Sequence, residues 1–373
     1  AEILSANGFK VTIYERKPTF GRKFLMAGRG GLNISHSENL DSFIKKYGMK
    51  SNIFKTVIDN FSPEKLCKWC EGLGEKTFIG SSGRIFPQSF KSSPLLRAWL
   101  GRLEKQNVIF KLNHDWLGWD QNNLIFKTKN GKIAVPSNTT ILSLGGASWP
   151  KLGSDGSWVK ILEREGVKIS PLQPSNCGFV TEWSIVFSKK FEGKSLKSIT
   201  LSFQDKKKHG ELIVTKNGVE GGPIYALSAF LREEININGS AQILLDLKPD
   251  FSIEEIQKRL LKPKLKLSMS NYLRKTLNLS DVAIGLVMEL PDRNNWIQNK
   301  IINAIKSYKL NLQKPFAIDR AISSAGGVTF NSVNDNFMLI NKPNVYVAGE
   351  MLDWEAPTGG YLLQACIANG AYV

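Results

Sequence analysis

The sequence has few of the residues that build metal sites and hydrolytic triads. It contains the cysteines Cys67, Cys70, Cys177 and Cys366 and the histidines His36, His114 and His209. Only Cys67 and Cys70 are close together, and structural zinc sites usually need two such pairs, so a metal site or a redox dithiol is disfavoured. The pair lies instead in a segment typical of a helix, with Ser62 as N-cap, Pro63 at the first position and Gly72 at the end.

Several catalytic signatures are also absent. The sequence has no G-x-x-x-x-G-K-[ST] phosphate loop, no H-E-x-x-H and no G-x-S-x-G. Its longest apolar stretches, such as Thr140–Leu144, are far shorter than the roughly 20 residues of a membrane-spanning helix, and no signal peptide is recognisable. We therefore expect a soluble, cytoplasmic bacterial protein, with no membrane partner and no metal, that delegates its chemistry to an organic cofactor.

The charge is strongly positive, with 50 Lys and Arg against 33 Asp and Glu and a formal net charge of +17. Such a balance suits a nucleic-acid or anionic-surface partner. The lysines are nevertheless dispersed, and local runs occur only at Lys206–Lys208 and Lys262–Lys266. A solvated basic surface is the favoured interpretation, and RNA binding stays open as the alternative.

The first residues predict half of a nucleotide-binding unit. Ala1–Gly8 is typical of a helix that ends at a glycine, and Phe9–Glu15 is typical of a strand that ends in an acid. In a Rossmann-like fold this acid lies about 20 residues after a G-x-G-x-x-G loop and binds ribose. We therefore expect the sequence to begin inside the first helix of such a unit, after the glycine loop, and to end inside a helix that starts near Gly359.

The rest of the 373 residues suggests two domains, one of them inserted into the other. Helices are expected through most of 38–106, with short extended pieces at 76–79 and 84–86. Strands are expected at 108–112, 123–127, 132–135 and 139–146, with a turn at Asn130-Gly131. The composition changes near 171–174, which predicts a nucleotide-binding α/β domain in two parts, at 1–174 and 322–373, with an inserted domain at 175–321.

The inserted segment reads as strands followed by helices. Short strands are expected between 178 and 247, including 198–203, 211–215 and 241–246, and Gly221–Tyr225 is interpreted as a plain turn near a possible pocket. Helices are expected from Ser252, where Glu255 completes a capping box, to about Tyr308. Strands return at 327–330, 337–340 and 345–348.

Four glycine-centred segments are the candidate functional elements. The first, 21–33, combines glycines with Arg22, Lys23 and Arg29 directly after the predicted ribose-binding acid. Glycines let backbone N–H groups approach a phosphate, and the cations compensate its charge. A flexible basic surface loop is the alternative, but the position after Glu15 favours a phosphate site.

The other three segments lie at similar junctions. At 142–156 a strand runs into Gly145-Gly146, which predicts a ligand-binding strand end, with an ordinary strand-to-helix connection as the alternative. At 345–360 a strand runs into Gly349-Glu350, and Thr358-Gly-Gly360 opens a helix whose positive end suits an electron-rich ring such as a flavin pyrimidine. At 80–87 Arg84 lies beside an apolar strand. The pattern is equally compatible with two roles for Arg84: contact with substrate or flavin, or a structural salt bridge.

Together the segments Gly21–Asn33, Leu144–Pro150 and Gly349–Gln364 resemble the BaiN/RdsA-type NAD(P)/FAD-dependent oxidoreductases, also known as aminoacetone oxidase-like flavoproteins. The residues Trp354-Glu-Ala-Pro357 resemble another flavoprotein branch more closely than the bile-acid-reducing branch. The resemblance spans nearly the whole chain and rests on three long motifs in the same order.

The resemblance implies a Rossmann-like FAD-binding domain of the glutathione-reductase type, interrupted by a domain with a β-barrel-like and a helical part. It implies an oxidoreductase that transfers hydride through FAD to or from a small molecule, with NAD(P)H as the electron donor. The alternatives are a flavin-binding protein that binds or modifies RNA and a non-catalytic nucleotide sensor.

The residue roles that the resemblance implies divide by segment. Glu15 would bind the adenosine ribose, the loop from Arg22 to Asn33 would line the pyrophosphate and flavin, Gly349-Glu350 would hold the ribityl and phosphate region, and Gly359-Gly360 would face the isoalloxazine ring. The predicted cofactor-binding residues are Glu15, Arg16, Arg22, Lys23, Met26, Gly28, Gly30, Gly31, Asn33, Gly145, Gly146, Gly349, Glu350, Gly359 and Gly360. No catalytic acid or base follows from the motifs.

Overall fold

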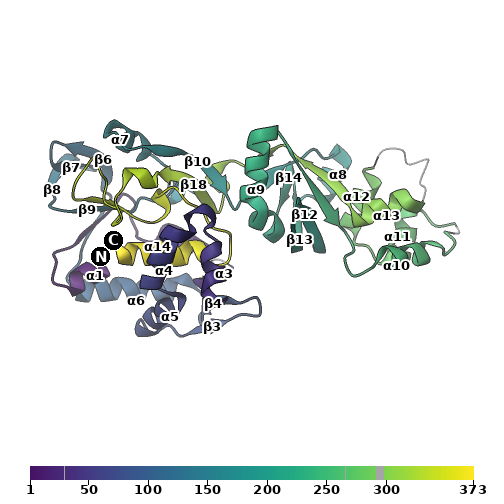
Figure 1. Cartoon of the computed structure of the whole chain (residues 1–373), viewed down its shortest axis with the longest axis horizontal. Helices are drawn as coiled ribbons and strands as arrows, with labels where there is room; N and C mark the ends of the chain where they lie inside the picture. Colours follow the sequence, from purple (N-terminus) through teal and green to yellow (C-terminus); the bar gives the residue numbers. More distant parts are fainter. Residues whose placement is uncertain (29, 265, 291–297) are drawn as a thin grey trace. The chain divides into compact units, whose positions relative to one another are not determined.

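The chain folds into two units that are not contiguous in sequence. The computed structural model describes residues 1–28, 30–264, 266–290 and 298–373. Unit 1 comprises Ala1–Gln173 and Ser323–Val373, and unit 2 comprises Pro174–Ile322. Figure 1 shows the elements of both units along the chain.

Unit 1 mixes short helices with several small sheets. Its helices are α1 (Glu2–Ala6), α2 (Arg22–Ala27), α3 (Leu40–Lys45), α4 (Ser51–Asn60), α5 (Pro63–Gly72), α6 (Ser92–Lys105), α7 (Val159–Arg164) and α14 (Tyr361–Tyr372). Its strands are β1 (Thr12–Glu15), β2 (Ser35–His36), β3 (Thr77–Ile79), β4 (Arg84–Pro87), β5 (Ile109–Leu112), β6 (Asp115–Asp120), β7 (Asn123–Thr128), β8 (Gly131–Pro136), β9 (Thr140–Leu142), β10 (Ile169–Ser175), β18 (Ser323–Val328) and β19 (Val345–Val347).

Parallel pairing joins segments that are far apart in the sequence. Strand β1 pairs with β5, and β9 pairs with β19 in the register Thr140↔Val345. Strands β2, β4 and β3 form an antiparallel sheet, and β6, β7 and β8 form a meander. Because parallel strands end at the same edge, the loops that follow β9 and β19 lie side by side, and this positions the candidate site.

The core of unit 1 forms where α14 packs against α4 (Figure 1). α14 is apolar on most of its surface, as expected for a helix buried on several sides. The fully buried Phe43 and Phe54 pack in the same cluster as Trp354 and Tyr361. This aromatic cluster fixes the start of α14 against α3 and α4.

Unit 2 is built on one antiparallel sheet. Its strands are β11 (Phe179–Val180), β12 (Ser195–Phe203), β13 (Lys206–Thr215), β14 (Gly218–Glu220), β15 (Ala241–Asp246), β16 (Tyr308–Leu312) and β17 (Lys314–Pro315). The strand order is β16-β15-β12-β13-β14-β11-β17, so the two outermost strands are separated in sequence by Gln313 alone. The sheet therefore curls back on itself, in agreement with the predicted barrel-like part.

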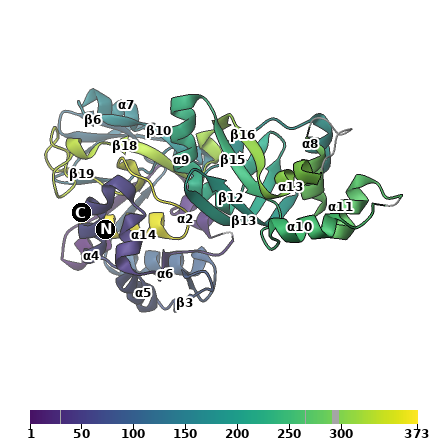
Figure 2. The same cartoon turned by 45° about the vertical axis from the view of Figure 1, so that its right-hand side comes forward.

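Helices cover this sheet and extend beyond one end of it. They are α8 (Ile185–Phe191), α9 (Gly222–Asn238), α10 (Ile253–Leu260), α11 (Met269–Leu277), α12 (Asp281–Met288) and α13 (Gln298–Lys306). Helix α9 packs on β12, β13 and β15 (Figure 2). The predicted capping box is present, because the Ser252 hydroxyl accepts from Glu255 N and the Glu255 carboxylate accepts from Ser252 N.

The prediction of a plain turn at Gly221–Tyr225 is wrong. The segment begins α9, the longest helix among the described residues, and Pro223 occupies its first turn. The buried residues Ile224, Leu227, Leu231 and Ile235 recur every three or four positions, which is the helical period. Strands were predicted throughout 178–247, and neither α9 nor α8 was predicted, because strands flank both helices.

Smaller differences occur in unit 1. The first glycine segment contains the helix α2 rather than a continuous loop, since Gly21 has φ +66 and acts as its N-cap. The expected strand at 337–340 forms only isolated bridges, Val333↔Leu339 and Met338↔Tyr346. Within the described ranges, none of the helices combines the length and apolar composition that crossing a bilayer requires.

Candidate cofactor site

Three of the four glycine segments meet at the carboxylate of Glu350. Its Oε2 lies 2.6 Å from Lys23 Nζ and accepts a long hydrogen bond of 3.4 Å from Gly146 N. Its Oε1 accepts from Ser324 N at 3.0 Å, and Lys23 also donates to Ser148 Oγ at 2.8 Å. The structure thus brings together residues that are 327 positions apart in the chain.

The local fold explains why these groups converge. Gly146 and Glu350 follow the parallel strands β9 and β19, and α2 projects Lys23 from its first turn towards the same edge. Glu350 is 9% exposed and the Lys23 side chain is 30% exposed. The free-energy cost of breaking this ion pair is therefore expected to fall between that of an exposed pair, about 0.5 kcal/mol, and that of a buried pair, about 3–5 kcal/mol.

Glycine is required at several of these positions by space or by backbone conformation. A Cβ on Gly146 would lie 2.3 Å from Ser324 Oγ and 2.6 Å from Ser324 Cβ. Gly145 and Gly349 have φ values of +74 and +75, a region that other residues rarely adopt. Gly349 N donates to Asn369 Oδ1 at 2.8 Å, which ties this turn to α14.

The beginning of α14 is similarly crowded. Gly359 and Gly360 have φ values of +131 and +92, and a Cβ on Gly360 would lie 2.6 Å from Ser35 Cα. The first N–H group bonded within the helix is that of Gln364, which donates to Gly360 O. The preceding N–H groups of the first turn lack intrahelical acceptors, so a partial positive charge lies at this helix end.

The predicted ribose-binding end borders a separate hollow of unit 1. Glu15 Oε1 accepts from Lys17 N at 2.8 Å, and Arg16 pairs with Asp155 at 2.8 Å. The hollow has a volume of about 270 Å³ and is lined by Arg16, Lys17, Asp115, Pro150 and Asp155. Partial burial tends to raise the pKa of Asp155, but hydrogen bonds from Arg16 and Ser157 outweigh it and hold this pKa below its usual value.

The remaining residues of the first segment have mainly packing contacts. Gly28 and Gly31 leave no room for a Cβ against Ser92 and Phe90, respectively. Asn33 Nδ2 donates to the carbonyls of Ser35 and Ile85, at 2.7 and 3.1 Å, so its amide joins β2 to β4.

The cations and flanking residues of that segment are more open. Arg22 Nε donates to Thr19 Oγ1 at 2.8 Å, Met26 is half-buried on α2, and Gly30 is exposed with open space around it. Arg29 lies outside the described residues. Arg84 is exposed on β4, opposite His36 in the sheet register.

These residues fit a large polar cofactor such as FAD. In the described part of the chain, eight buried side-chain polar atoms have no hydrogen-bond partner, and such atoms ordinarily have one. Five of them lie on or beside the predicted cofactor segments: Arg16 Nε, Ser35 Oγ, Ser154 Oγ, Gln364 Oε1 and Asn369 Nδ2. The glycine turns and these polar atoms together provide the donors and acceptors that a dinucleotide requires.

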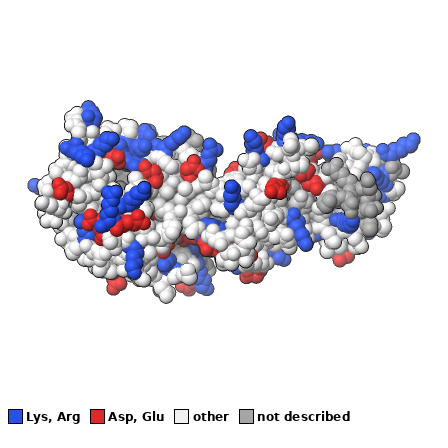
Figure 3. Space-filling view, turned by 90° about the horizontal axis from the view of Figure 1, so that it is seen from above, with Lys and Arg blue, Asp and Glu red and all other residues white. Residues whose placement is uncertain are grey.

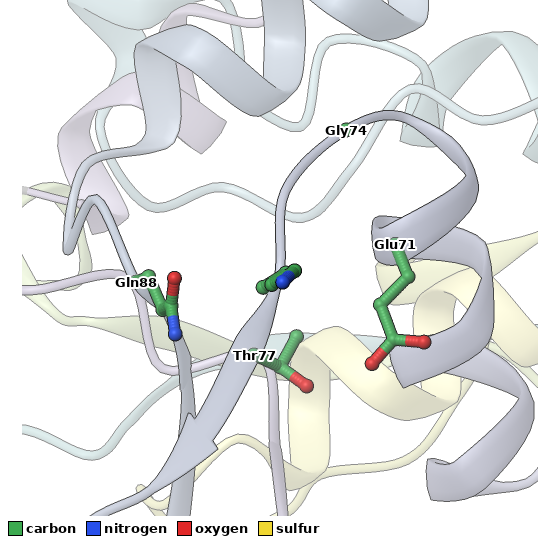
Figure 4. A pocket seen from close by; sticks show the side chains of 5 residues that line it. Glu71, Gly74, Thr77 and Gln88 are labelled. Atoms are coloured by element: carbon green, nitrogen blue, oxygen red, sulfur yellow. The ribbon is translucent and has the colours of Figure 1, made fainter.

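A second hollow lies apart from these segments. It is lined by Glu71, Gly74, Lys76, Thr77 and Gln88, on α5 and around β3 (Figure 4). Its lining includes none of the predicted cofactor residues.

The cysteines of α5 lie in the same region. Burial raises the pKa of Cys70 to about 12, so the thiol stays protonated and a redox role is disfavoured. Across the described ranges, no group of three His, Cys, Asp or Glu side chains is placed to hold a metal ion.

Sequence reasoning missed a second polar cluster at the start of α14. The Tyr361 hydroxyl donates to the Glu38 carboxylate, and the His36 ring stacks on Tyr361 with centroids 5.5 Å apart. Burial and then the hydrogen bond to Glu38 raise the pKa of Tyr361 above its usual value. His36 and Glu38 carry no motif of their own, and only their place directly after Asn33 links them to the first segment.

Comparisons with known proteins show the family to which the chain is similar over its whole length. The family model described as "HI0933-like protein Rossmann domain" matches residues 1–373. The chain is 23% identical over 382 residues to the "3-dehydro-bile acid delta(4,6)-reductase" of Clostridium scindens, covering 97% of this chain and 91% of that protein. It is 22% identical over 388 residues to the "Ribosomal RNA dihydrouridine synthase" of Haemophilus influenzae, covering 97% and 90%.

Solved structures give more distant matches. The open conformation of a flavocytochrome c3 fumarate reductase is 13% identical with a TM-score of 0.48, covering 98% of this chain and 78% of that one. The 3-ketosteroid-delta4-(5alpha)-dehydrogenase of Rhodococcus jostii RHA1 is 12% identical with a TM-score of 0.45, covering 100% and 94%.

Proposed function

Because the chain belongs to the HI0933-like Rossmann-domain family, we propose that it transfers hydride between bound FAD and a small organic molecule, with NAD(P)H as the electron donor. The family membership confirms the resemblance to BaiN/RdsA-type flavoproteins, the α/β class with a Rossmann-type FAD-binding domain, and the enzyme class of FAD-dependent oxidoreductase. The roles of individual residues, the donor and the substrate are our proposals.

The convergence on Glu350 carries the assignment of residues. A buried carboxylate alone would repel the phosphates of FAD, but Lys23 neutralises it at 2.6 Å. We infer that Gly145-Gly146, Gly349-Glu350 and Lys23 hold the ribityl and phosphate region, and that Glu15 and Arg16 hold the adenosine ribose beside the hollow at Asp155. The remaining predicted residues of the first segment would line the pyrophosphate and the flavin.

Backbone groups at the start of α14 would interact with the flavin ring of bound FAD. FAD, when bound, supplies a two-electron carrier that the side chains lack. The free N–H groups at the start of α14 favour negative charge near Gly359-Gly360, which stabilises a reduced ring by about 0.3–1 kcal/mol or more when shielded from water.

The proposed substrate class comes from the name of one relative. The Clostridium scindens relative is named as a reductase of a 3-dehydro bile acid. We therefore propose an unsaturated carbonyl compound as the first class of acceptor to test, and NADH and NADPH as donors. Flavin bands that bleach with either donor and recover on adding the acceptor would support this.

The direct test is cofactor loading. The purified protein, incubated with FAD and freed of excess ligand, is expected to show flavin absorption bands near one FAD per chain. Lys23→Met is expected to weaken FAD binding at least tenfold, since it leaves the Glu350 carboxylate unpaired next to the phosphates. Lys55→Met is the matched control, because Lys55 forms an exposed ion pair with Asp59 at 2.9 Å. A colourless wild-type protein that takes up no FAD would refute the proposal.

A second candidate function is a flavin-binding protein that binds or modifies RNA. The Haemophilus influenzae relative is named for ribosomal RNA. In unit 2 an exposed basic stretch, the α10 basic stretch, contains Lys258, Arg259, Lys262, Lys264 and Lys266. On the face seen in Figure 3, Lys and Arg are interspersed with Asp and Glu.

An RNA gel shift tests this candidate. Binding that weakens steeply with salt, and weakens further when the four lysines of the α10 basic stretch are changed to Gln, would support it. Binding without salt dependence, or no binding, would remove it.

A further inference from the structure

The polar cluster at the start of α14 has no assigned role, and its geometry is that of a proton path. Tyr361 is 5% exposed, and its hydroxyl donates to Glu38 Oε1. The Glu38 side chain is 20% exposed and so reaches solvent. A shielded phenol is thus joined by one hydrogen bond to a carboxylate that can exchange protons with water.

Charged and titratable side chains from several elements surround Glu38 and Tyr361. His36 Nδ1 on β2 lies 3.9 Å from Glu38 Oε1, and Lys46 Nζ after α3 lies 3.7 Å from Glu38 Oε2. Arg84 on β4 acts electrostatically on Tyr361. Tyr47 donates its hydroxyl to Tyr361 O at 2.9 Å and does not bond to Glu38. The Lys46 cation offsets part of the charge of the Glu38 carboxylate.

His36 is held in one tautomer by its backbone contacts. Its Nδ1 accepts from Glu38 N at 3.1 Å, and its Nε2 lies 3.0 Å from Ser82 O, a carbonyl that needs a donor. The proton of neutral His36 is therefore on Nε2, and both ring nitrogens are used. His36 supports the Tyr361 ring by stacking, and Glu38 is the group left to exchange a proton with the phenol.

The cluster adjoins the predicted flavin-facing turn. Tyr361 directly follows Gly359-Gly360, and the backbone of Ser35, the residue before His36, fills the space where Gly360 lacks a Cβ. Reduction of the C=C bond of an unsaturated carbonyl compound adds a hydride to one carbon and a proton to the neighbouring carbon. Under the proposed function bound FAD would supply the hydride, and the proton needs a separate donor.

We propose that Tyr361 and Glu38 form the proton relay of this enzyme, a proposal that rests on the proposed function. As hydride arrives at one carbon of the substrate's C=C bond, the electron pair of that bond forms a C–H bond between the neighbouring carbon and the phenol proton of Tyr361. The Tyr361 O–H bond breaks, and Tyr361 Oη then takes up a proton that Glu38 has received from water. Tyr361 is the catalytic residue, and Glu38 acts through it.

The experiment uses FAD-loaded protein and needs no known substrate. The midpoint potential of bound FAD is measured from pH 5 to 9 for wild type, Glu38→Gln and, as a control, Tyr308→Phe at a buried tyrosine of unit 2. Negative charge gained on reduction raises the proton affinity of a nearby carboxylate. Wild type and Tyr308→Phe are therefore expected to take up more protons per two electrons, and so to show a steeper dependence on pH, than Glu38→Gln, which lacks the carboxylate.

A second readout separates the relay from a structural role. With a donor or acceptor that turns over, Glu38→Gln and Tyr361→Phe are expected to lower kcat by about 10²-fold or more and to shift its pH profile, with little change in KM. Flavin-loaded variants with the wild-type slope and pH profile would overturn the relay alone. A wild-type protein without flavin bands would overturn the proposed function as well.

Discussion

Replacing Gly146 by Ala tests the packing at the centre of the candidate site. The added methyl group would lie 2.3 Å from Ser324 Oγ and 2.6 Å from Ser324 Cβ, both too close for any real contact. Ser324 is fully buried, and its hydroxyl accepts from Ala147 N at 2.9 Å. Overpacking costs about 1–3 kcal/mol, and the strained hydrogen bond adds about 0.5–1.5 kcal/mol. We therefore expect Gly146→Ala to lower the free energy of unfolding by about 2–4 kcal/mol.

The measurement is urea unfolding followed by circular dichroism, with a rescue and a control. Adding Ser324→Gly to Gly146→Ala removes the clash and is expected to recover more than half of the loss. Gly101→Ala is the control, since nothing lies within 4 Å of its added methyl in α6. It is expected to stabilise by up to about 1 kcal/mol because Ala favours helix. A Gly146→Ala protein as stable as wild type, or no recovery in the double variant, would contradict the packing argument.

Three further predictions concern stability and reactivity. The pKa of Asp155 is held low in the folded protein, so the stability that its carboxylate contributes is present above the unfolded pKa of about 3.9 and is lost as the pH falls below it. In thermal melts, wild type should therefore lose more stability than Asp155→Asn between pH 5 and pH 3. Equal losses would count against the Arg16–Asp155 pair. Ser252→Ala removes the capping box of α10 and should cost about 1 kcal/mol, against no change for the exposed Ser81→Ala. Cys70 should resist alkylation at pH 8 in the native protein and react in urea; rapid native labelling, mapped by mass spectrometry, would disprove its burial.

Sequence patterns predicted elements wherever local chemistry and tertiary packing agree. The capping box at Ser252, the Asn130-Gly131 hairpin and the strand ending at Glu15 all formed, because each depends on neighbouring residues. Helix α9 was missed because its sequence lies among strands and opens with Gly221-Gly-Pro223, a common turn signal. Buried apolar residues at helical spacing were the available signal.

The candidate site divides in the same way. Glycines often occur where the backbone lies very close to another part of the chain or to a ligand, so Gly145-Gly146 and Gly349 could be found from the sequence alone. The partners of those glycines, such as Ser324 and Asn369, are ordinary polar residues that become specific only when the chain brings them close. No local pattern distinguishes Ser324 from other serines, and the same holds for Glu38.

Residues from Gly349 to Tyr361 connect the Glu350 cluster with the Tyr361 cluster. Gly349 N donates to Asn369 Oδ1 on α14, and Trp354 Nε1 donates to Gly349 O at 2.9 Å. The Trp354 ring is 3% exposed and packs on Phe54 and Tyr47. Because Tyr47 also bonds to Tyr361 O, the carboxylate that meets Lys23 and the phenol that meets Glu38 are held by one shared aromatic cluster. If the two clusters act as proposed, contacts that hold both in place before charge moves would favour catalysis.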